Sequence, residues 1–77
     1  MNDTRRKELA AISALISEAW SRLEGVRDEE QDAFDNMPES FQNGERGEAM
    51  TEAIDKLSEH CDALQTVSGE LDELTGN

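Results

Sequence analysis

Two apolar-periodic runs of nearly equal length flank Pro38, the only proline of the chain. In each run, apolar residues recur at alternating spacings of three and four, which is the seam of a heptad pattern. In the first run they are Leu9, Ile12, Ile16, Ala19, Leu23 and Val26, and the phase continues through Glu30, Ala33 and Met37. In the second run they are Met50, Ile54, Leu57, Cys61, Leu64, Ser68 and Leu71. The pattern predicts two long amphipathic helices that pack against each other.

The stretch between the runs carries the signals of a hinge. A residue that precedes proline is disfavoured in the α region, so the first helix should end near Asn36. Pro38 suits the first position of a short helical turn, and Asn43-Gly44 then breaks that turn. The expected order is a helix over about residues 4–36, a hinge with a short turn over about 37–44, and a helix over about 45–75.

Helices of equal length that are joined by a short connection lie antiparallel. We therefore expect a single all-α domain over residues 1–77, an antiparallel helical hairpin of the coiled-coil type. In this pairing Leu23 faces Leu57, and Ile12 faces Ser68. A glycine inside a helix costs about 1 kcal/mol relative to alanine. Gly47 therefore needs a packing reason, and the pairing places it opposite Ala33.

A second set of residues lies on the flanks of the predicted seam. A two-helix hairpin has one mutual seam, so this surplus needs another surface. The flanking residues are Leu15, Trp20, His60, Val67 and Leu74. Short chains bury little apolar area, and association is a common remedy. We expect a homodimer in which two hairpins form a four-helix bundle, with these residues as self-association or anchor positions.

The formal net charge is −12, from 19 acidic residues against seven Lys and Arg. This charge disfavours direct contact with nucleic acid or an anionic membrane, and it favours a basic protein partner. On the second helix the acids form one stripe: Glu45, Glu48, Glu52, Asp55, Glu59 and Asp62. Near the end of the first helix they form a dense group, Asp28, Glu29, Asp32 and Asp35, with Glu30 among them. These acidic stripes are the candidate partner-binding surface.

Two interpretations of the acidic stripes stay open. They can be a solvated face that keeps a helical bundle soluble. They can also imitate a nucleic-acid backbone and occupy the basic channel of a nucleic-acid-binding protein, because duplex DNA carries one charge per ~1.7 Å of its axis. The group at the end of the first helix places its carboxylates at a comparable density along the helix axis.

No residue pattern in the chain indicates catalysis, a cofactor or a metal. Cys61 is the only cysteine, so no intramolecular disulfide can form, which fits a reducing cytosol. His60 and Cys61 are adjacent on a helix and diverge by about 100°, so they make a poor ligand pair. Residues 28–39 place acids as a calcium loop would, but Ala33 stands where the sharp turn requires glycine. We expect a protein that is not an enzyme.

The first residues, MNDTRRKELAA, are not followed by an apolar core of signal-peptide length, and no apolar run could cross a membrane. The sequence therefore predicts a cytoplasmic protein with no membrane contact.

The run from Asp28 to Leu57, with its DNMPES, ERGE and EAID pieces, resembles a motif in short acidic helical proteins of tailed phages and prophages. It covers about two-fifths of the chain. The resemblance implies a host cytoplasm as the setting and an accessory protein that acts by binding host machinery. The function expected from it is non-enzymatic capture of a basic host protein, such as a nuclease of a CRISPR or restriction defence. The alternative is a structural coiled-coil module that assembles or docks through its apolar flanks.

Overall fold

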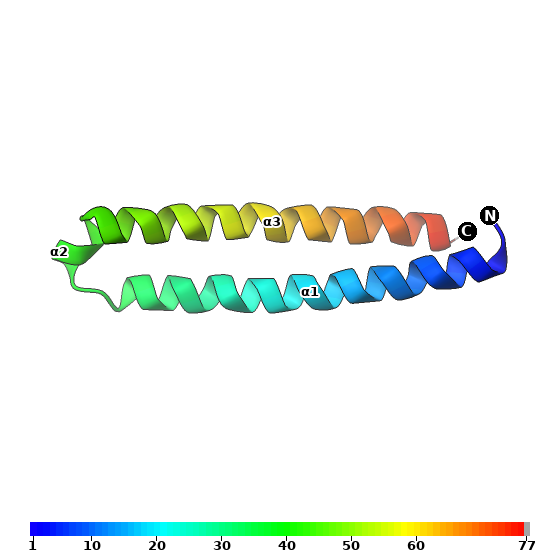
Figure 1. Ribbon diagram of the computed structural model, residues 1–77, viewed down its shortest axis with the longest axis horizontal. Helices are drawn as coiled ribbons and strands as arrows, with labels where there is room; N and C mark the ends of the chain where they lie inside the picture. The colour runs from blue at the N-terminus through cyan, green and yellow to red at the C-terminus, as the bar shows by residue number, and fades with distance from the viewer. Residues whose placement is uncertain (77) are drawn as a thin grey trace.

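The protein is a hairpin of two long antiparallel helices joined by one short helix (Figure 1). The computed structural model describes residues 1–76. Helix α1 covers Asp3–Asp35, α2 covers Glu39–Gln42, and α3 covers Glu45–Thr75. The hairpin measures 58 × 14 × 13 Å, and the start of α1 and the end of α3 lie at the end opposite α2 (Figure 1). The all-α hairpin predicted from the two heptad runs is therefore present.

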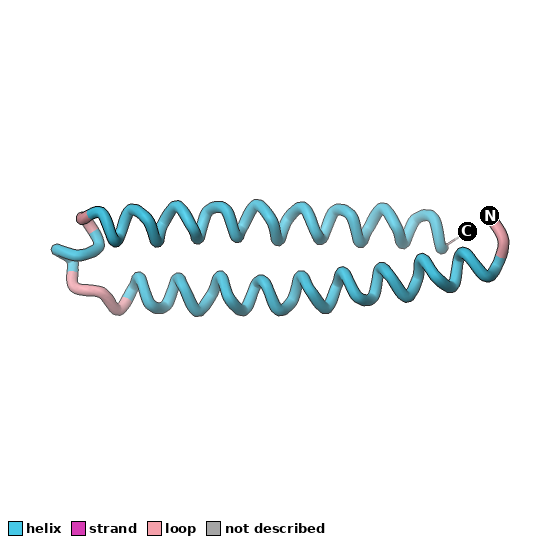
Figure 2. Tube along the Cα trace, viewed as in Figure 1, coloured by secondary structure: helices cyan, strands magenta, loops and turns pink. Residues whose placement is uncertain are grey.

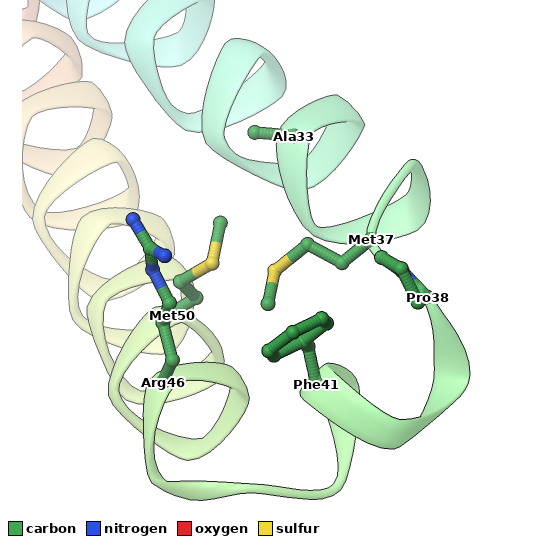
Figure 3. A pocket seen from close by; sticks show the side chains of 6 residues that line it. All are labelled: Ala33, Met37, Pro38, Phe41, Arg46 and Met50. Atoms are coloured by element: carbon green, nitrogen blue, oxygen red, sulfur yellow. The ribbon is translucent and has the colours of Figure 1, made fainter.

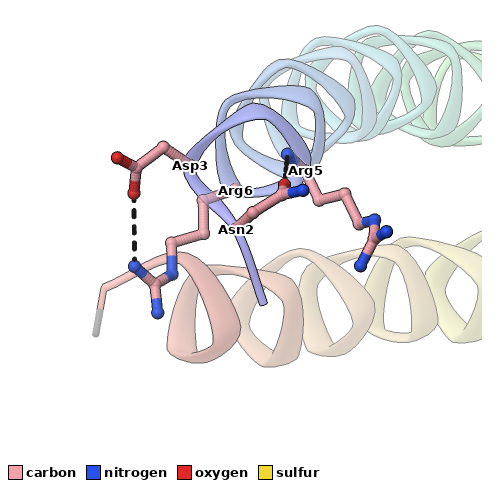
Figure 4. Close-up of polar contacts among 4 residues, drawn as sticks. All are labelled: Asn2, Asp3, Arg5 and Arg6. Atoms are coloured by element: carbon pink, nitrogen blue, oxygen red, sulfur yellow. Dashed lines mark hydrogen bonds and ion pairs between the residues drawn. The ribbon is translucent and has the colours of Figure 1, made fainter.

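The start of α1 is fixed by a side-chain cap. Asn2 has extended backbone angles, and its Oδ1 accepts a hydrogen bond from the amide of Arg5 at 2.9 Å (Figure 4). An amide donor in the first turn has no partner within the helix, so this bond satisfies a group that would otherwise face only water. Arg6 pairs with Asp3 in the same turn, with 3.5 Å between Nη1 and Oδ1 (Figure 4).

The hinge is built around Pro38, which precedes the first residue of α2. The carbonyl of Pro38 accepts hydrogen bonds from the amides of Phe41 and Gln42, and this closes the short turn. The side chain of Gln42 reaches back and donates through Nε2 to the carbonyl of Phe34 at 2.9 Å. That carbonyl belongs to the last turn of α1, where acceptors lack partners within the helix. The two loops on either side of α2 are short (Figure 2).

Gly47 allows α3 to start directly beside α2. A Cβ atom at this position would overlap the backbone carbonyl of Gln42 and would lie 2.7 Å from its Cα. The expectation that Gly47 has a packing reason is confirmed, but the expected neighbour was wrong. The close backbone is that of Gln42 in α2 rather than that of Ala33 in α1, because the end of α2 lies against the first turn of α3.

The seam of α3 follows the predicted phase. Its buried residues are Gly47, Ile54, Cys61 and Ser68, which recur every seventh position. Met50, Leu57, Leu64 and Leu71 are half-buried beside them. This row therefore forms the contact with α1 along the whole of the helix.

The seam of α1 differs from the predicted one. Every second seam position lies one residue further along the chain than expected. Leu9, Ile16 and Leu23 are half-buried as predicted, but Ile12 is 38% exposed and Val26 is 51% exposed. The buried position is Ser13, which is 3% exposed, and Trp20, Arg27 and Phe34 follow it at intervals of seven. The prediction that Ile12, Ala19, Val26 and Ala33 belong to the seam was wrong.

Hydrogen bonds between the helices explain why a serine can occupy the seam. The Ser13 hydroxyl donates to Oδ1 of Asp72 at 2.6 Å and lies 3.1 Å from the Ser68 hydroxyl. Ser68 in turn lies 2.9 Å from the hydroxyl of Ser17. A buried hydroxyl destabilises a fold mainly when it has no partner, and each of these has one. Ser68 therefore faces Ser13, and the expected pair of Ile12 with Ser68 is corrected.

Candidate interaction surfaces

The predicted acidic residues all lie on the outside of the hairpin. The six acids of α3 form what we call the α3 stripe: Glu45, Glu48, Glu52, Asp55, Glu59 and Asp62. Four acids near the end of α1 form the α1 cluster: Asp28, Glu29, Asp32 and Asp35. Every one of these ten residues is exposed. Because the helices are antiparallel, the α1 cluster and the first half of the α3 stripe meet at the hinge end of the molecule (Figure 1).

Few cations neutralise these carboxylates. Lys56 pairs with Glu52 at 3.2 Å, and Arg27 pairs with Asp28 at 2.9 Å. The hydrogen bond to Asp28 raises the pKa of the Arg27 guanidinium above its ordinary value, with the charge of Asp28 as a further cause. The other eight carboxylates of the stripe and cluster form no ion pair within residues 1–76. The hinge end is thus a strongly negative surface that is exposed to solvent.

One edge of the hairpin is apolar, and the opposite edge is polar. Ser17 lies four residues after the buried Ser13, and Asp72 lies four residues after the buried Ser68. Ser17 hydrogen-bonds to Ser68 and Asp72 to Ser13, and these two bonds mark the polar edge. Ile12 and Val67 each precede a buried serine by one residue. On a helix these two offsets fall on opposite sides of the seam. Ile12 and Val67 therefore belong to the other edge.

Residues that recur every seven positions from Ile12 and Val67 complete this second edge. We call it the apolar edge, and it consists of Ile12, Ala19, Val26 and Ala33 on α1 and Ala53, His60, Val67 and Leu74 on α3, with Arg5 and Arg46 at its ends. Val26, Val67 and Leu74 are 51%, 43% and 53% exposed, which is high for side chains of this kind. Leu15, 65% exposed, lies beside the edge. None of the 19 acidic residues belongs to the apolar edge.

At the hinge, the apolar edge ends in an open hollow of about 410 Å³. We call it the hinge hollow; it is lined by Ala33, Met37, Pro38, Phe41, Arg46 and Met50. Figure 3 shows the side chains of Met37 and Met50 in the space between α1 and α3, with the end of Met37 over the ring of Phe41. Phe41 is 56% exposed, although it is aromatic. Ala33 and Arg46 belong to the apolar edge and line the same hollow, which shows that the α1 and α3 rows share one side of the hairpin.

The residues predicted as self-association or anchor positions do not all lie on one surface. His60, Val67 and Leu74 lie on the apolar edge, and Leu15 lies beside it. Trp20 is half-buried and shares the phase of Ser13, so it faces the seam rather than the apolar edge. The sequence did not identify Ile12 and Val26 as exposed residues of the apolar edge, because its heptad pattern assigned them to the seam. The signal that could have found them is the phase of Trp20 and Phe34, two large rings that favour the buried side of α1.

Within the described part of the chain, no three His, Cys, Asp or Glu side chains gather closely enough to hold a metal ion. Cys61 is only 2% exposed and lies in the seam, where it acts as a small apolar residue. Neither long helix, as far as residue 76, contains a stretch apolar enough to span a bilayer.

A scan against protein-family models finds no match for the chain, and searches of the curated proteins and of the solved structures find no similar protein.

Proposed function

We propose that this chain is a non-enzymatic binding protein that pairs through its apolar edge and presents its acidic surfaces to a basic protein. The observation that carries the proposal is the separation of the two kinds of surface. The exposed Ile12, Val26, Val67 and Leu74 share an edge without a carboxylate, while the α1 cluster and the α3 stripe face solvent elsewhere. Exposed apolar residues that gather in one region of a soluble protein mark an interaction site.

The surface area supports pairing. The chain exposes 5638 Å² at a mass of 8.6 kDa. A compact folded monomer of this mass exposes about 4,700 Å², so the hairpin exposes about 900 Å² more. A standard interface buries about 800 Å² on each partner. A homodimer that forms a four-helix bundle would remove an area of this size from water and leave the carboxylates outside.

The acidic surfaces fit a basic partner that binds nucleic acid. The α3 stripe holds six carboxylates along about 26 Å of helix, and the hinge brings the α1 cluster to the same end of the molecule. A basic channel that tracks a phosphate backbone would meet a comparable row of negative charges. The protein would then block that channel by occupying it. A host nuclease of a defence system is one partner with such a channel, in line with the phage resemblance.

The test of this proposal reverses the charge of the α3 stripe. The variant Glu52→Lys, Asp55→Lys, Glu59→Lys is expected to lose capture of basic nucleic-acid-binding proteins while it keeps its helicity in circular dichroism. The matched control carries the same change in net charge away from the stripe, at Glu8→Lys, Glu18→Lys and Glu70→Lys. Capture that survives the stripe reversal, or that fails equally in the control, would refute a specific role for the stripe.

The second candidate is a structural module whose purpose is assembly alone. The apolar edge favours it, because this surface needs no acidic neighbour in order to pair. Under this alternative, Val67→Gln disrupts assembly, while the stripe reversal changes neither assembly nor any function of the protein. The two candidates are therefore separated by whether a basic partner is captured at all.

A further inference from the structure

The positions of the apolar edge are spaced evenly about its own middle. Ala19 is the central residue of α1, which covers Asp3–Asp35, and His60 is the central residue of α3, which covers Glu45–Thr75. Ile12 and Val26 lie at equal distances from the first centre, and Arg46 and Leu74 lie at equal distances from the second, while Val67 has the smaller Ala53 as its counterpart. A twofold rotation that reverses the direction of the hairpin about this middle therefore places Ile12 of one copy level with Val26 of the other. It also brings Leu74 to the level of Arg46 and the hinge hollow.

The hinge hollow, about 410 Å³, is larger than a second hollow of about 240 Å³ at the open end, which is lined by Met1, Arg5, Glu8 and Leu9. Met37, Phe41 and Met50 line the hinge hollow and leave apolar surface exposed to water. At the opposite end of the edge, Leu74 lies on α3 with 53% of its surface exposed. A leucine in the hinge hollow would supply the contacts that its lining lacks.

Charge separates the two possible orientations of a pair. The hinge end carries the α1 cluster, Glu39 and the first half of the α3 stripe, and the cations near it are Arg27, Arg46 and Lys56. The open end carries Arg5, Arg6 and Lys7 among its acids. A head-to-head pair would place two strongly negative hinge ends together. In an antiparallel pair, called head-to-tail below, the hinge end of each copy lies beside the open end of the other. The two hinge ends are then separated by a distance near the 58 Å length of the hairpin, far beyond the screening length of about 8 Å at physiological salt.

We infer that a second copy of this chain docks head-to-tail on the apolar edge, with Leu74 of each copy seated in the hinge hollow of the other. This arrangement rests on the pairing proposed above and adds its orientation and its anchor. The interface is isologous, so the same residues contribute from both sides and the assembly closes as a dimer. α1 then lies against α1 of the second copy, and Ala19 and His60 lie next to the twofold axis.

The experiment measures distances between spin labels in the full-length chain with Cys61→Ala as background. A label at Ser40→Cys, on the exposed α2, reports the separation of the two hinge ends. The head-to-tail dimer predicts a distance that approaches the 58 Å length of the hairpin. A head-to-head dimer predicts a distance within about two helix diameters, roughly 20 Å. A label at the exposed Ser21→Cys, near the middle of α1, serves as the control, because it gives a short distance in either orientation.

A short distance at Ser40, or a monomer by sedimentation at micromolar and higher concentrations, overturns the inference. The anchor is tested separately with Leu74→Glu, which is expected to weaken pairing by at least tenfold, against Thr66→Glu on an exposed position outside the edge. Equal pairing of these two variants would exclude Leu74 as the anchor. Capture of a basic protein is measured on the same samples. A chain that pairs head-to-tail without capture refutes the binding proposal alone, and capture by a chain whose hinge labels lie close together refutes the orientation alone.

Discussion

The hydroxyl of Ser13 on α1 lies 3.1 Å from the hydroxyl of Ser68 on α3, and both residues are buried. Each serine occupies a seam position that a coiled coil usually gives to an apolar residue. The pair sets the alignment of the two helices near the open end, and it turns Ile12 and Val67 away from the seam. The apolar edge is thus a direct consequence of where the serines pair.

Replacement of Ser13 by alanine tests this pair. The change removes the donor to Asp72 and one partner of Ser68, so it should lower the free energy of unfolding by about 1 kcal/mol. Ser21→Ala, on an exposed position of the same helix, should change it by less than about 0.5 kcal/mol. Urea denaturation at one fixed protein concentration measures both. A double-mutant cycle with Ser68→Ala should show coupling, and purely additive effects would contradict the pairing.

Gly47 gives the sharpest contrast among the glycines. Gly47→Ala should lower the free energy of unfolding by about 1–3 kcal/mol, because the added methyl group overlaps the Gln42 backbone. Gly25→Ala and Gly69→Ala should raise it by about 0.5–1 kcal/mol, because they lie in helix interiors with open space around the site. Thermal or urea denaturation of the three variants checks the difference in sign. A stabilising Gly47→Ala would mean that α2 does not lie against α3.

The apolar edge can be tested with two adjacent residues of α3. Val67→Gln places an amide on the edge, and Thr66→Gln places the same group on the neighbouring exposed position. Burial of a valine contributes about 1.5 kcal/mol, and a dimer contains the residue twice, so Val67→Gln should weaken pairing by about 100-fold. Sedimentation equilibrium measures the dissociation constants. Equal values for the two variants would place the interface elsewhere.

The acidic surfaces predict a strong dependence of partner capture on salt. Exposed charges are screened over about 8 Å at physiological ionic strength and over shorter distances above it. Capture of a basic protein should therefore weaken at least tenfold between about 50 and 200 mM salt, as it does for phosphate contacts. Calorimetric titration at several salt concentrations measures this. Affinity that is insensitive to salt would point to the apolar edge as the surface that the partner contacts.

The N-terminal cap predicts a local effect. Asn2→Ala removes the acceptor for the Arg5 amide and should destabilise the first turn of α1 by about 1 kcal/mol. Asn2→Asp keeps an acceptor and should behave like the natural chain. Hydrogen exchange of the Arg5 amide reports the difference directly, and equal exchange in the three proteins would show that the cap does not hold this turn.

The hairpin could be predicted from the sequence because its determinants are local. Pro38 ends α1 through its effect on the preceding residue, and the heptad spacing identifies α3 and its seam without knowledge of the partner helix. The sequence indicated that Gly47 must have a close neighbour. It did not identify Gln42 as that neighbour, because the contact depends on the path of α2. Local signals thus define the elements better than they define what lies beside them.

The seam of α1 was predicted only in part, because the rings of Trp20 and Phe34 were the one local sign of its true phase. Leu9, Ile16 and Leu23 fit two phases equally well, one that adds Ile12 and Val26 and one that adds Ser13 and Trp20. Hydrophobicity favours the first phase. The structure adopts the second because Ser68 and Asp72, more than fifty residues away, satisfy the Ser13 hydroxyl. Such a cross-helix partner has no signature in the local pattern, and the hinge hollow was missed for the same reason.

The burial of Cys61 provides a reporter of helix separation. This thiol is the only one in the chain and is 2% exposed between α1 and α3, so a thiol reagent can reach it only when the two helices move apart. The alkylation rate of the natural, unlabelled protein therefore measures how often the hairpin opens. Any partner that clamps the helices together should slow that reaction, whichever surface it contacts.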